Sequence, residues 1–170
     1  ARLSVRHVAK KGGMLIGFHE RKSSYVADMT RWEILSPKVA ALLVPLRDLV
    51  MTMDAGERMP QIEVAIGEAE EGALVTALVF RVLDAPSAAD RDALAAFARD
   101  RGVEMWLQPG GPDTIALLWP EGGSALRYAL PSFDVTLPFA PTDFTQVNAG
   151  INRSLVERAA QTIDVEKATK

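Results

Sequence analysis

The chain has 170 residues, of which 48% are hydrophobic and 24% charged, and its formal net charge is -3. This balance is typical of one soluble globular domain and excludes a mainly disordered chain. No apolar stretch approaches the roughly 20 residues that cross a bilayer, so we expect no membrane partner and a cytoplasmic location. Cysteine is absent, which excludes disulfides, thiolate metal sites and a cysteine nucleophile from these residues. Ala1 in place of Met and a polar end over 166–170 indicate a piece of a longer protein.

The first part of the chain predicts three short strands. Apolar-rich runs over 3–8 and 14–19 flank Lys10-Lys11-Gly12-Gly13, whose glycines suit a hairpin turn. Residues 25–29 predict a third strand. Together these residues predict an antiparallel start to the fold.

Helices and a second hairpin follow. Ser36 and Pro37 predict a helix start, and apolar residues spaced by three and four extend this helix to near Gly56. The runs 61–65 and 74–83 predict a second hairpin. Three residues mark the start and the end of the next predicted helix: Ser87 as its N-cap, Asp90 in its first turn and Gly102 at its end.

The last part predicts three strands, over 103–107, 114–119 and 125–139, and a helix from near Asn148. This helix carries its apolar residues on one face, namely Ile151, Leu155, Ala159 and Ile163. The predicted order is βββ-α-ββ-α-βββ-α, with about eight strands. Because helices return after hairpins, this order favours an α+β fold with antiparallel sheets and flanking helices.

Basic residues gather near the start of the chain. Residues 1–38 carry a charge of +5 and the remaining residues -8. Such clustering is typical of a surface that faces a polyanion. A solvated sheet face without a partner explains the same charge equally well.

The two histidines do not predict a metal site. A turn centred between Lys11 and Gly12 sets His7 opposite Ile16 and His19 opposite Ser4, so that the imidazoles are not neighbours. We therefore predict no metal ligands among these residues.

Other candidate sites have simpler explanations. The Gly110-Gly111 pair lacks the residues of a phosphate-binding loop and predicts a turn. Trp106 and Trp119 lie in apolar strands and are expected in the core, whereas Trp32 is either a core residue or a base-stacking platform.

One segment combines an aromatic residue with several amides: Phe144-Thr145-Gln146-Val147-Asn148-Ala149-Gly150-Ile151-Asn152. By itself it fits an ordinary helix start with an asparagine cap and a hydrophobic anchor. It also resembles the stretch that leads into the catalytic domain of the RNA uracil-C5-methyltransferases that use S-adenosylmethionine, most closely those of 23S ribosomal RNA. Further similar stretches occur in the same order and extend the resemblance to nearly the whole chain: Arg2-Leu3-Ser4, Gly17-Phe18-His19-Glu20-Arg21-Lys22-Ser23, Val26-Ala27-Asp28, Ile34-Leu35-Ser36-Pro37 and Pro86-Ser87-Ala88-Ala89-Asp90-Arg91.

The resemblance implies a division of the chain and of the longer protein. Residues 1–140 correspond to a central α+β region, and 141–170 to a connector and first helix that lead toward a Rossmann-like methyltransferase domain. An RNA-binding barrel precedes this region in the family. The cofactor loop, catalytic cysteine and general-base glutamate follow it. The full-length protein is therefore expected to be an enzyme, whereas this piece alone is expected to be inactive.

The resemblance also implies a reaction and site residues. A cysteine adds to C6 of a uridine in ribosomal RNA, C5 takes the methyl group, and a base removes the C5 proton. Gln146 matches a glutamine that contacts S-adenosylmethionine, and Phe144 lies near the target base. We expect the basic residues of the first strands to hold the RNA backbone, namely Arg2, Arg6, Lys10, Lys11, Arg21 and Lys22.

One departure from the family pattern concerns an iron–sulfur cluster. Trp32 stands where ribosomal RNA members often have a cluster-binding cysteine. Tryptophan cannot ligate iron, so no cluster is expected. A non-catalytic RNA-binding module, or a degenerate cluster-free relative, is the alternative to an enzyme fragment.

Overall fold

The computed structural model describes residues 1–23, 25–27, 35–70, 72–146 and 148–163. Within these ranges the strands are β1 (Arg2–Val8), β2 (Gly13–Gly17), β3 (Gln61–Glu68), β4 (Leu74–Arg81), β5 (Glu104–Gln108), β6 (Ala116–Trp119), β7 (Leu126–Leu130) and β8 (Val135–Phe139). The α-helices are α1 (Pro37–Ala40), α2 (Leu43–Thr52), α3 (Ala88–Arg101) and α4 (Ala149–Thr162). These strands form one sheet in the order β2-β1-β3-β4-β5-β6, while β7 pairs with β3 and with β8. The predicted α+β class is confirmed.

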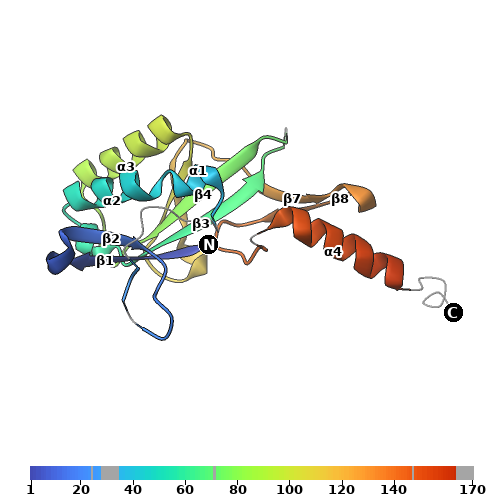
Figure 1. Ribbon diagram of the computed structural model, residues 1–170. Coiled ribbons are helices and arrows are strands. Elements are labelled where there is room, and N and C mark those ends of the chain that lie inside the picture. Colours follow the sequence, from blue (N-terminus) through green and yellow to red (C-terminus); the bar gives the residue numbers. More distant parts are fainter. Residues whose placement is uncertain (24, 28–34, 71, 147, 164–170) are drawn as a thin grey trace.

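Helices α1, α2 and α3 cover one face of the sheet (Figure 1). The main hydrophobic core lies between these helices and the strands. Leu3 of β1, Phe80 of β4 and Leu94 of α3 are fully buried there. Since side chains alternate between the faces of a strand, the neighbours of Leu3 on β1, Arg2 and Ser4, lie on the opposite face.

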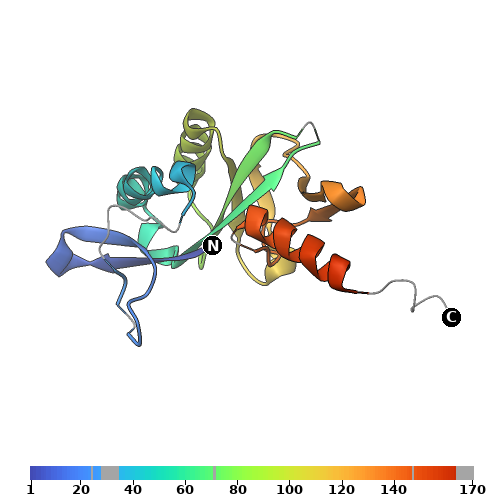
Figure 2. The ribbon, with the colours of Figure 1, turned by 45° about the vertical axis from the view of Figure 1, so that its right-hand side comes forward.

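The β7–β8 hairpin and α4 lie at the end of the sheet away from the β1–β2 hairpin (Figures 1 and 2). The hairpin joins the sheet where Glu68 of β3 pairs with Arg127 of β7. A second core cluster holds this junction together, and Gly67 is essential to it because a Cβ there would lie 2.9 Å from the Phe139 ring. This hairpin therefore depends on close contact with β3.

The first hairpin is confirmed, but its predicted register is wrong by two residues. The turn is a 3-10 segment, Ala9–Lys11, followed by Gly12 at φ 83°, and Val8 pairs with Gly13. His7 therefore lies opposite Met14, not Ile16. The turn is centred one residue earlier than predicted because Gly13 already belongs to the second strand.

Two further predictions about the first third of the chain are wrong. Val26 forms only an isolated bridge with His19, so the described part of 25–29 is not a strand of the sheet; Asp28, Met29 and Trp32 lie outside the described residues. The helix predicted from Ser36 to near Gly56 is two helices, α1 and α2. Pro45 explains the break, because its ring would clash with the Ala41 carbonyl in a continuous helix.

The last strands also differ from the prediction. Residues 125–139 are not one strand but the hairpin β7–β8, which reverses at the 3-10 turn Pro131–Phe133 and at Asp134, φ 52°. The sheet is also not wholly antiparallel, since β4 and β5 pair in parallel. Helix α3 joins these two strands as a crossover, which is the connection that a parallel pair requires.

The predicted caps of the last two helices are confirmed. Ser87 accepts a hydrogen bond from the Asp90 amide at 3.1 Å, and Gly102 ends α3 with a φ of 60°. The Asn148 side chain accepts a hydrogen bond from the Ile151 amide at 3.0 Å and starts α4. Over the residues that the structure describes, no helix is long and apolar enough to span a bilayer.

Candidate functional site

Between β8 and α4 lies a connector, residues 140–148, whose described residues 141–146 and 148 line two cavities. At the start of this connector, Asp143 accepts a hydrogen bond from the Ala140 amide at 2.7 Å, and its own amide donates to the Ala140 carbonyl. At its end, Asn148 caps α4. Both ends of the connector are therefore held by local hydrogen bonds.

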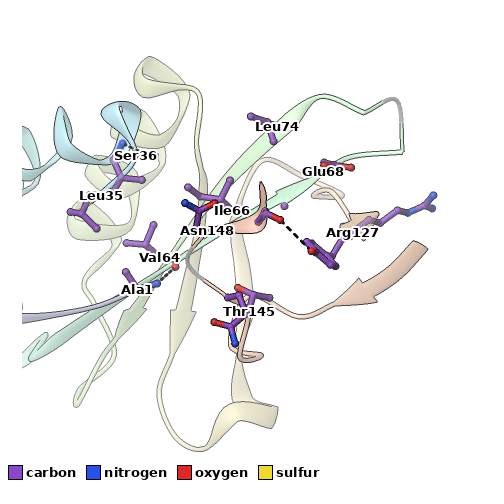
Figure 3. Close-up of a pocket in the computed structure, with 15 residues that line it drawn as sticks. Ala1, Leu35, Ser36, Val64, Ile66, Glu68, Leu74, Arg127, Thr145 and Asn148 are labelled. Carbon is purple, nitrogen blue, oxygen red and sulfur yellow. Dashed lines mark hydrogen bonds between the residues drawn. The ribbon is translucent and has the colours of Figure 1, made fainter. Parts of the chain in front are cut away.

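The first cavity, here the Gln146 cavity, has a volume of about 360 Å³. Figure 3 shows it between β3, β7, the start of α1 and the start of α4. Its polar lining comes from distant parts of the chain, namely Ser36, Glu68, Arg127, Tyr128, Thr145, Gln146 and Asn148. Hydrogen-bonding groups and an apolar wall from Val39, Val64 and Ile66 thus face the same space.

The second cavity, here the Phe144 cavity, has a volume of about 410 Å³ and is lined by Ala1, Arg2, 63–65 and 141–145. Phe144 itself is 87% exposed, so most of its ring is free of contact with the described residues. Arg2 and Phe144, two predicted site residues from opposite ends of the chain, are therefore brought together. Gln146 is exposed at the neighbouring cavity, and Thr145 lines both.

Charges at the Phe144 cavity are partly balanced. Arg2 forms an ion pair with Glu63 at 3.1 Å, and Gln61 donates a hydrogen bond to the same carboxylate at 2.7 Å. The Ala1 backbone nitrogen donates to the Val64 carbonyl at 2.6 Å (Figure 3).

The other predicted basic residues lie away from both cavities. Arg6 is exposed on β1, on the same face as Arg2. Lys10 and Lys11 are exposed in the turn at the far end of β1, and Arg21 and Lys22 are exposed in the loop after β2. The structure thus places Arg2 and Arg6 along β1, between the connector and the Lys10-Lys11 turn, with Arg21 and Lys22 on a separate loop.

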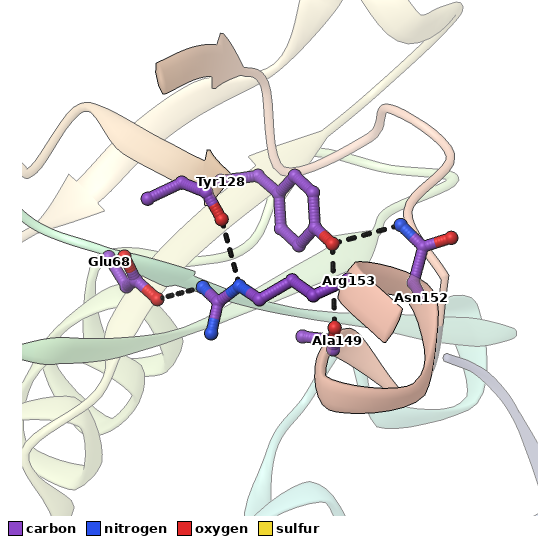
Figure 4. Close-up of polar contacts among 6 residues, drawn as sticks. Glu68, Tyr128, Ala149, Asn152 and Arg153 are labelled. Atoms are coloured by element: carbon purple, nitrogen blue, oxygen red, sulfur yellow. Dashed lines mark hydrogen bonds and ion pairs between the residues drawn. The ribbon is translucent and has the colours of Figure 1, made fainter. Parts of the chain in front are cut away.

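The sequence did not predict the group that anchors α4. Arg153 donates to the Ala129 carbonyl at 2.8 Å and to Glu68 at 2.6 Å, and it lies over the Tyr128 ring at 5.4 Å (Figure 4). Asn152 donates to the Tyr128 hydroxyl at 2.9 Å. These contacts fix the start of α4, and with it the connector, against β3 and β7.

The histidines have separate partners. His7 lies 3.0 Å from Glu57, and His19 hydrogen-bonds to Ser4 at 2.8 Å. No group of three or more His, Cys, Asp or Glu side chains with metal-binding geometry occurs in the described ranges. Trp106, expected in the core, is partly buried and donates to the buried Glu104 at 3.1 Å.

Comparison with known proteins shows which class of protein this chain is similar to. No protein-family model matches the chain. Curated proteins do match it along nearly its whole length, and they are RNA uracil-C5-methyltransferases. The resemblance predicted from the sequence is therefore confirmed.

The particular relatives are named 23S rRNA (uracil(1939)-C(5))-methyltransferase RlmD. The protein from Cupriavidus necator is 57% identical over 98% of this chain, that from Ralstonia nicotianae 58% over 96%, and that from Burkholderia pseudomallei 56% over 100%. The chain covers only 36%, 35% and 35% of these proteins, respectively. It is thus homologous to about a third of their length.

Proposed function

We propose that this chain is the central region of a longer enzyme that methylates C5 of a uridine in 23S ribosomal RNA with S-adenosylmethionine. The observation that carries the proposal is the identity of 56–58% to the named methyltransferases over 96–100% of the chain. Lacking cysteine, these 170 residues have no nucleophile for C6 and are inactive alone. The rest of the polypeptide supplies the reaction centre.

Gln146 contributes one edge of the methyl-donor site in this proposal. Its carboxamide can both donate and accept hydrogen bonds, which suits the hydroxyl, amino and carboxylate groups of S-adenosylmethionine. The exposure of Gln146 at a polar cavity supports this role. The anchoring of α4 by Arg153 supports it too, because a fixed connector holds the amide in one place.

RNA lies along β1 in this proposal. Extended strands rise about 3.3 Å per residue, so β1 spans roughly 20 Å between Arg2 and the Lys10-Lys11 turn. Arg2, Arg6, Lys10 and Lys11 contact phosphates along this path, while Arg21 and Lys22 contact a second part of the RNA. The exposed Phe144 ring, beside Arg2, provides a stacking surface for an unpaired base.

The protein works without an iron–sulfur cluster in this proposal. The absence of cysteine from the 170 residues, together with Trp32 at the position of the family's ligand, supports it. Anaerobically purified full-length protein is then expected to contain no stoichiometric iron. Iron at several atoms per chain, with activity that depends on it, would contradict this part of the proposal.

Methyl transfer to unmodified 23S ribosomal RNA tests the proposed function. Full-length protein and S-adenosylmethionine should convert one uridine to 5-methyluridine, measured by mass spectrometry of nuclease fragments. Gln146→Ala should raise the KM for S-adenosylmethionine at least 10-fold, because one lost hydrogen bond to a charged or polar ligand group is worth about 1.4 kcal/mol or more. Gln161→Ala, which removes an exposed amide near the far end of α4 and outside both cavity linings, is the control. RNA binding without methyl transfer by any full-length preparation would favour a non-catalytic RNA-binding module.

A further inference from the structure

An imidazole from the loop after β2 lies on the exposed face of β1. The His19 Nε2 and the Ser4 Oγ are joined by a hydrogen bond of 2.8 Å, and the His19 side chain is exposed. Ser4 alternates along β1 with the buried Leu3 and Val5, so it lies on the face of the sheet away from the helices. The His19 ring therefore lies on that face too. Val26, which bridges to His19 within the loop, is apolar.

Charged residues from three elements set the electrostatic potential at His19. On β1, Arg2 and Arg6 are two positions from Ser4 in either direction, and strand geometry sets each Cα about 6.6 Å from that of Ser4. On β3, Glu63 pairs with Arg2 at 3.1 Å. The loop around His19 adds its own titratable side chains, all of them exposed, namely Glu20, Arg21, Lys22 and Tyr25. Cations outnumber acids among these described residues, which favours an anionic ligand.

The hydroxyl and the imidazole together form a site for an anionic oxygen. A protonated imidazole donates from both ring nitrogens, and Ser4 contacts only one of them. The Nε2 group then donates to the Ser4 Oγ, and the Nδ1 group donates to the ligand in a charge-assisted hydrogen bond. The contact with Ser4 also holds the ring in one orientation, which reduces the rotamer entropy lost on binding.

A serine beside a histidine is also the start of a nucleophile–base pair, but the surroundings of this pair do not suit catalysis. Acyl transfer requires a substrate pocket that contains donors for an oxyanion. Neither the Gln146 cavity nor the Phe144 cavity includes Ser4 or His19 in its lining. The pair lies instead on an open face of β1, where it suits the reversible binding of an anion.

We propose that His19, positioned by Ser4, binds a backbone phosphate of the ribosomal RNA between Arg2 and Arg6, and that it does so in its protonated form. This inference rests on the RNA path along β1 of the proposed function. Imidazole changes its charge between pH 5 and 8, whereas guanidinium and ammonium side chains stay charged over this range. The contribution of His19 to RNA affinity is therefore expected to increase as the pH falls.

RNA binding by the full-length protein at about pH 5.5 and about pH 7.5 tests this inference. The parent should bind a uridine-containing stem-loop more tightly at the lower pH. His19→Gln should reduce this gain in affinity by roughly 5-fold or more, because a hydrogen bond to a charged group is lost. At the lower pH it should also reduce the salt slope by about 0.7, the contribution of one phosphate contact in single-stranded RNA.

Two further changes separate a phosphate contact from a merely structural role. His19→Lys, which carries a permanent charge, should bind RNA at the higher pH as tightly as the parent does at the lower pH. Ser4→Ala should reduce the gain in affinity at low pH, and Ser4→Thr, which keeps a hydroxyl, should restore it. Because both side chains lie at the surface, all of these variants should unfold at the same temperature as the parent.

His7→Gln is the matched control. His7 is the other histidine of the 170 residues, and it lies on the helix side of β1, 3.0 Å from Glu57. Its removal should leave the gain in affinity and the salt slope unchanged. Equal gains in the parent and in His19→Gln, or an equal loss in His7→Gln, would overturn the inference. Methylation of the RNA by a protein with such results would refute this phosphate site alone, whereas a full-length protein that neither binds nor methylates RNA would refute the proposed function as well.

Discussion

Asp84 and Arg58 form an exposed pair whose response to pH is defined by the structure. The Arg58 Nε donates to an Asp84 oxygen at 2.5 Å, and this hydrogen bond, together with the charge of Arg58, holds the pKa of the carboxyl below its ordinary value. A group with a lowered folded pKa stabilises the protein above its unfolded pKa, near 3.9. That stabilisation is lost as the pH falls through the folded pKa.

The Asp84 titration is therefore expected to depend on Arg58. Arg58→Ala should move the midpoint of the Asp84 carboxyl signal upward in an NMR titration and weaken the acid dependence of stability that this pair causes. Arg91→Ala, which removes an equal charge from α3, should leave the Asp84 midpoint unchanged. An unchanged midpoint in Arg58→Ala would show that the pair does not persist in solution.

Single residues also show how far the site could be predicted. Phe144 and Gln146 stay predictions, and they rest on a local stretch that resembles a family motif, because the order of neighbouring residues is visible in a sequence. The partners that hold them in place were missed, because Arg153 bonds to Glu68 across 85 positions and to Ala129 across 24. No spacing rule connects such residues before the strands and helices are placed.

At the scale of elements, one buried carboxylate couples α3 to the end of α2. Asp90 is only 4% exposed, and its oxygens accept hydrogen bonds from the Asp54 and Ala55 amides at 3.0 and 3.1 Å. Asp90→Ala would leave both amides without this acceptor, and we expect it to lower the free energy of unfolding by about 2–3 kcal/mol. Urea denaturation measures this change. Asp92→Ala, an exposed change on the same helix, should stay within about 0.5 kcal/mol; equal effects of the two variants would refute the coupling.

Elements with local start and stop signals were predicted well, and elements defined by long-range pairing were not. Ser87 and Gly102 bound α3 because caps are chemical signals within one turn. The break between α1 and α2 was missed because Pro45 suits the first turn of a new helix and also prevents a longer one. The β7–β8 turn was missed because Asp134 adopts a positive φ without a glycine to signal it.

At the scale of the whole molecule, the fold separates two surfaces. Helices α1 to α3 cover one face of the sheet, while Arg2 and Arg6 lie on the other face of β1. The connector and both cavities adjoin the Arg2 end of β1, and the Lys10-Lys11 turn marks its far end. The acidic excess of the later residues thus does not exclude a local basic path for RNA.

RNA binding by the 170-residue chain tests that path. Affinity for a uridine-containing stem-loop should fall linearly with salt on logarithmic axes, because bound phosphates release counterions. Neutralising Lys10 and Lys11 together, as Lys10→Gln and Lys11→Gln, should reduce the slope by about 1.4 to 1.8, the contribution of two phosphate contacts.

The matched control removes the same charge from the opposite side of the sheet, as Arg91→Gln and Arg99→Gln in α3. This pair should leave the salt slope within about 0.5 of the parent value, since α3 lies on the helix-covered face and outside the path. Equal losses from both double variants would show that only net charge attracts RNA. Absence of binding even at low salt would mean that recognition resides in the other parts of the full-length protein, and that β1 supports the connector without contacting RNA.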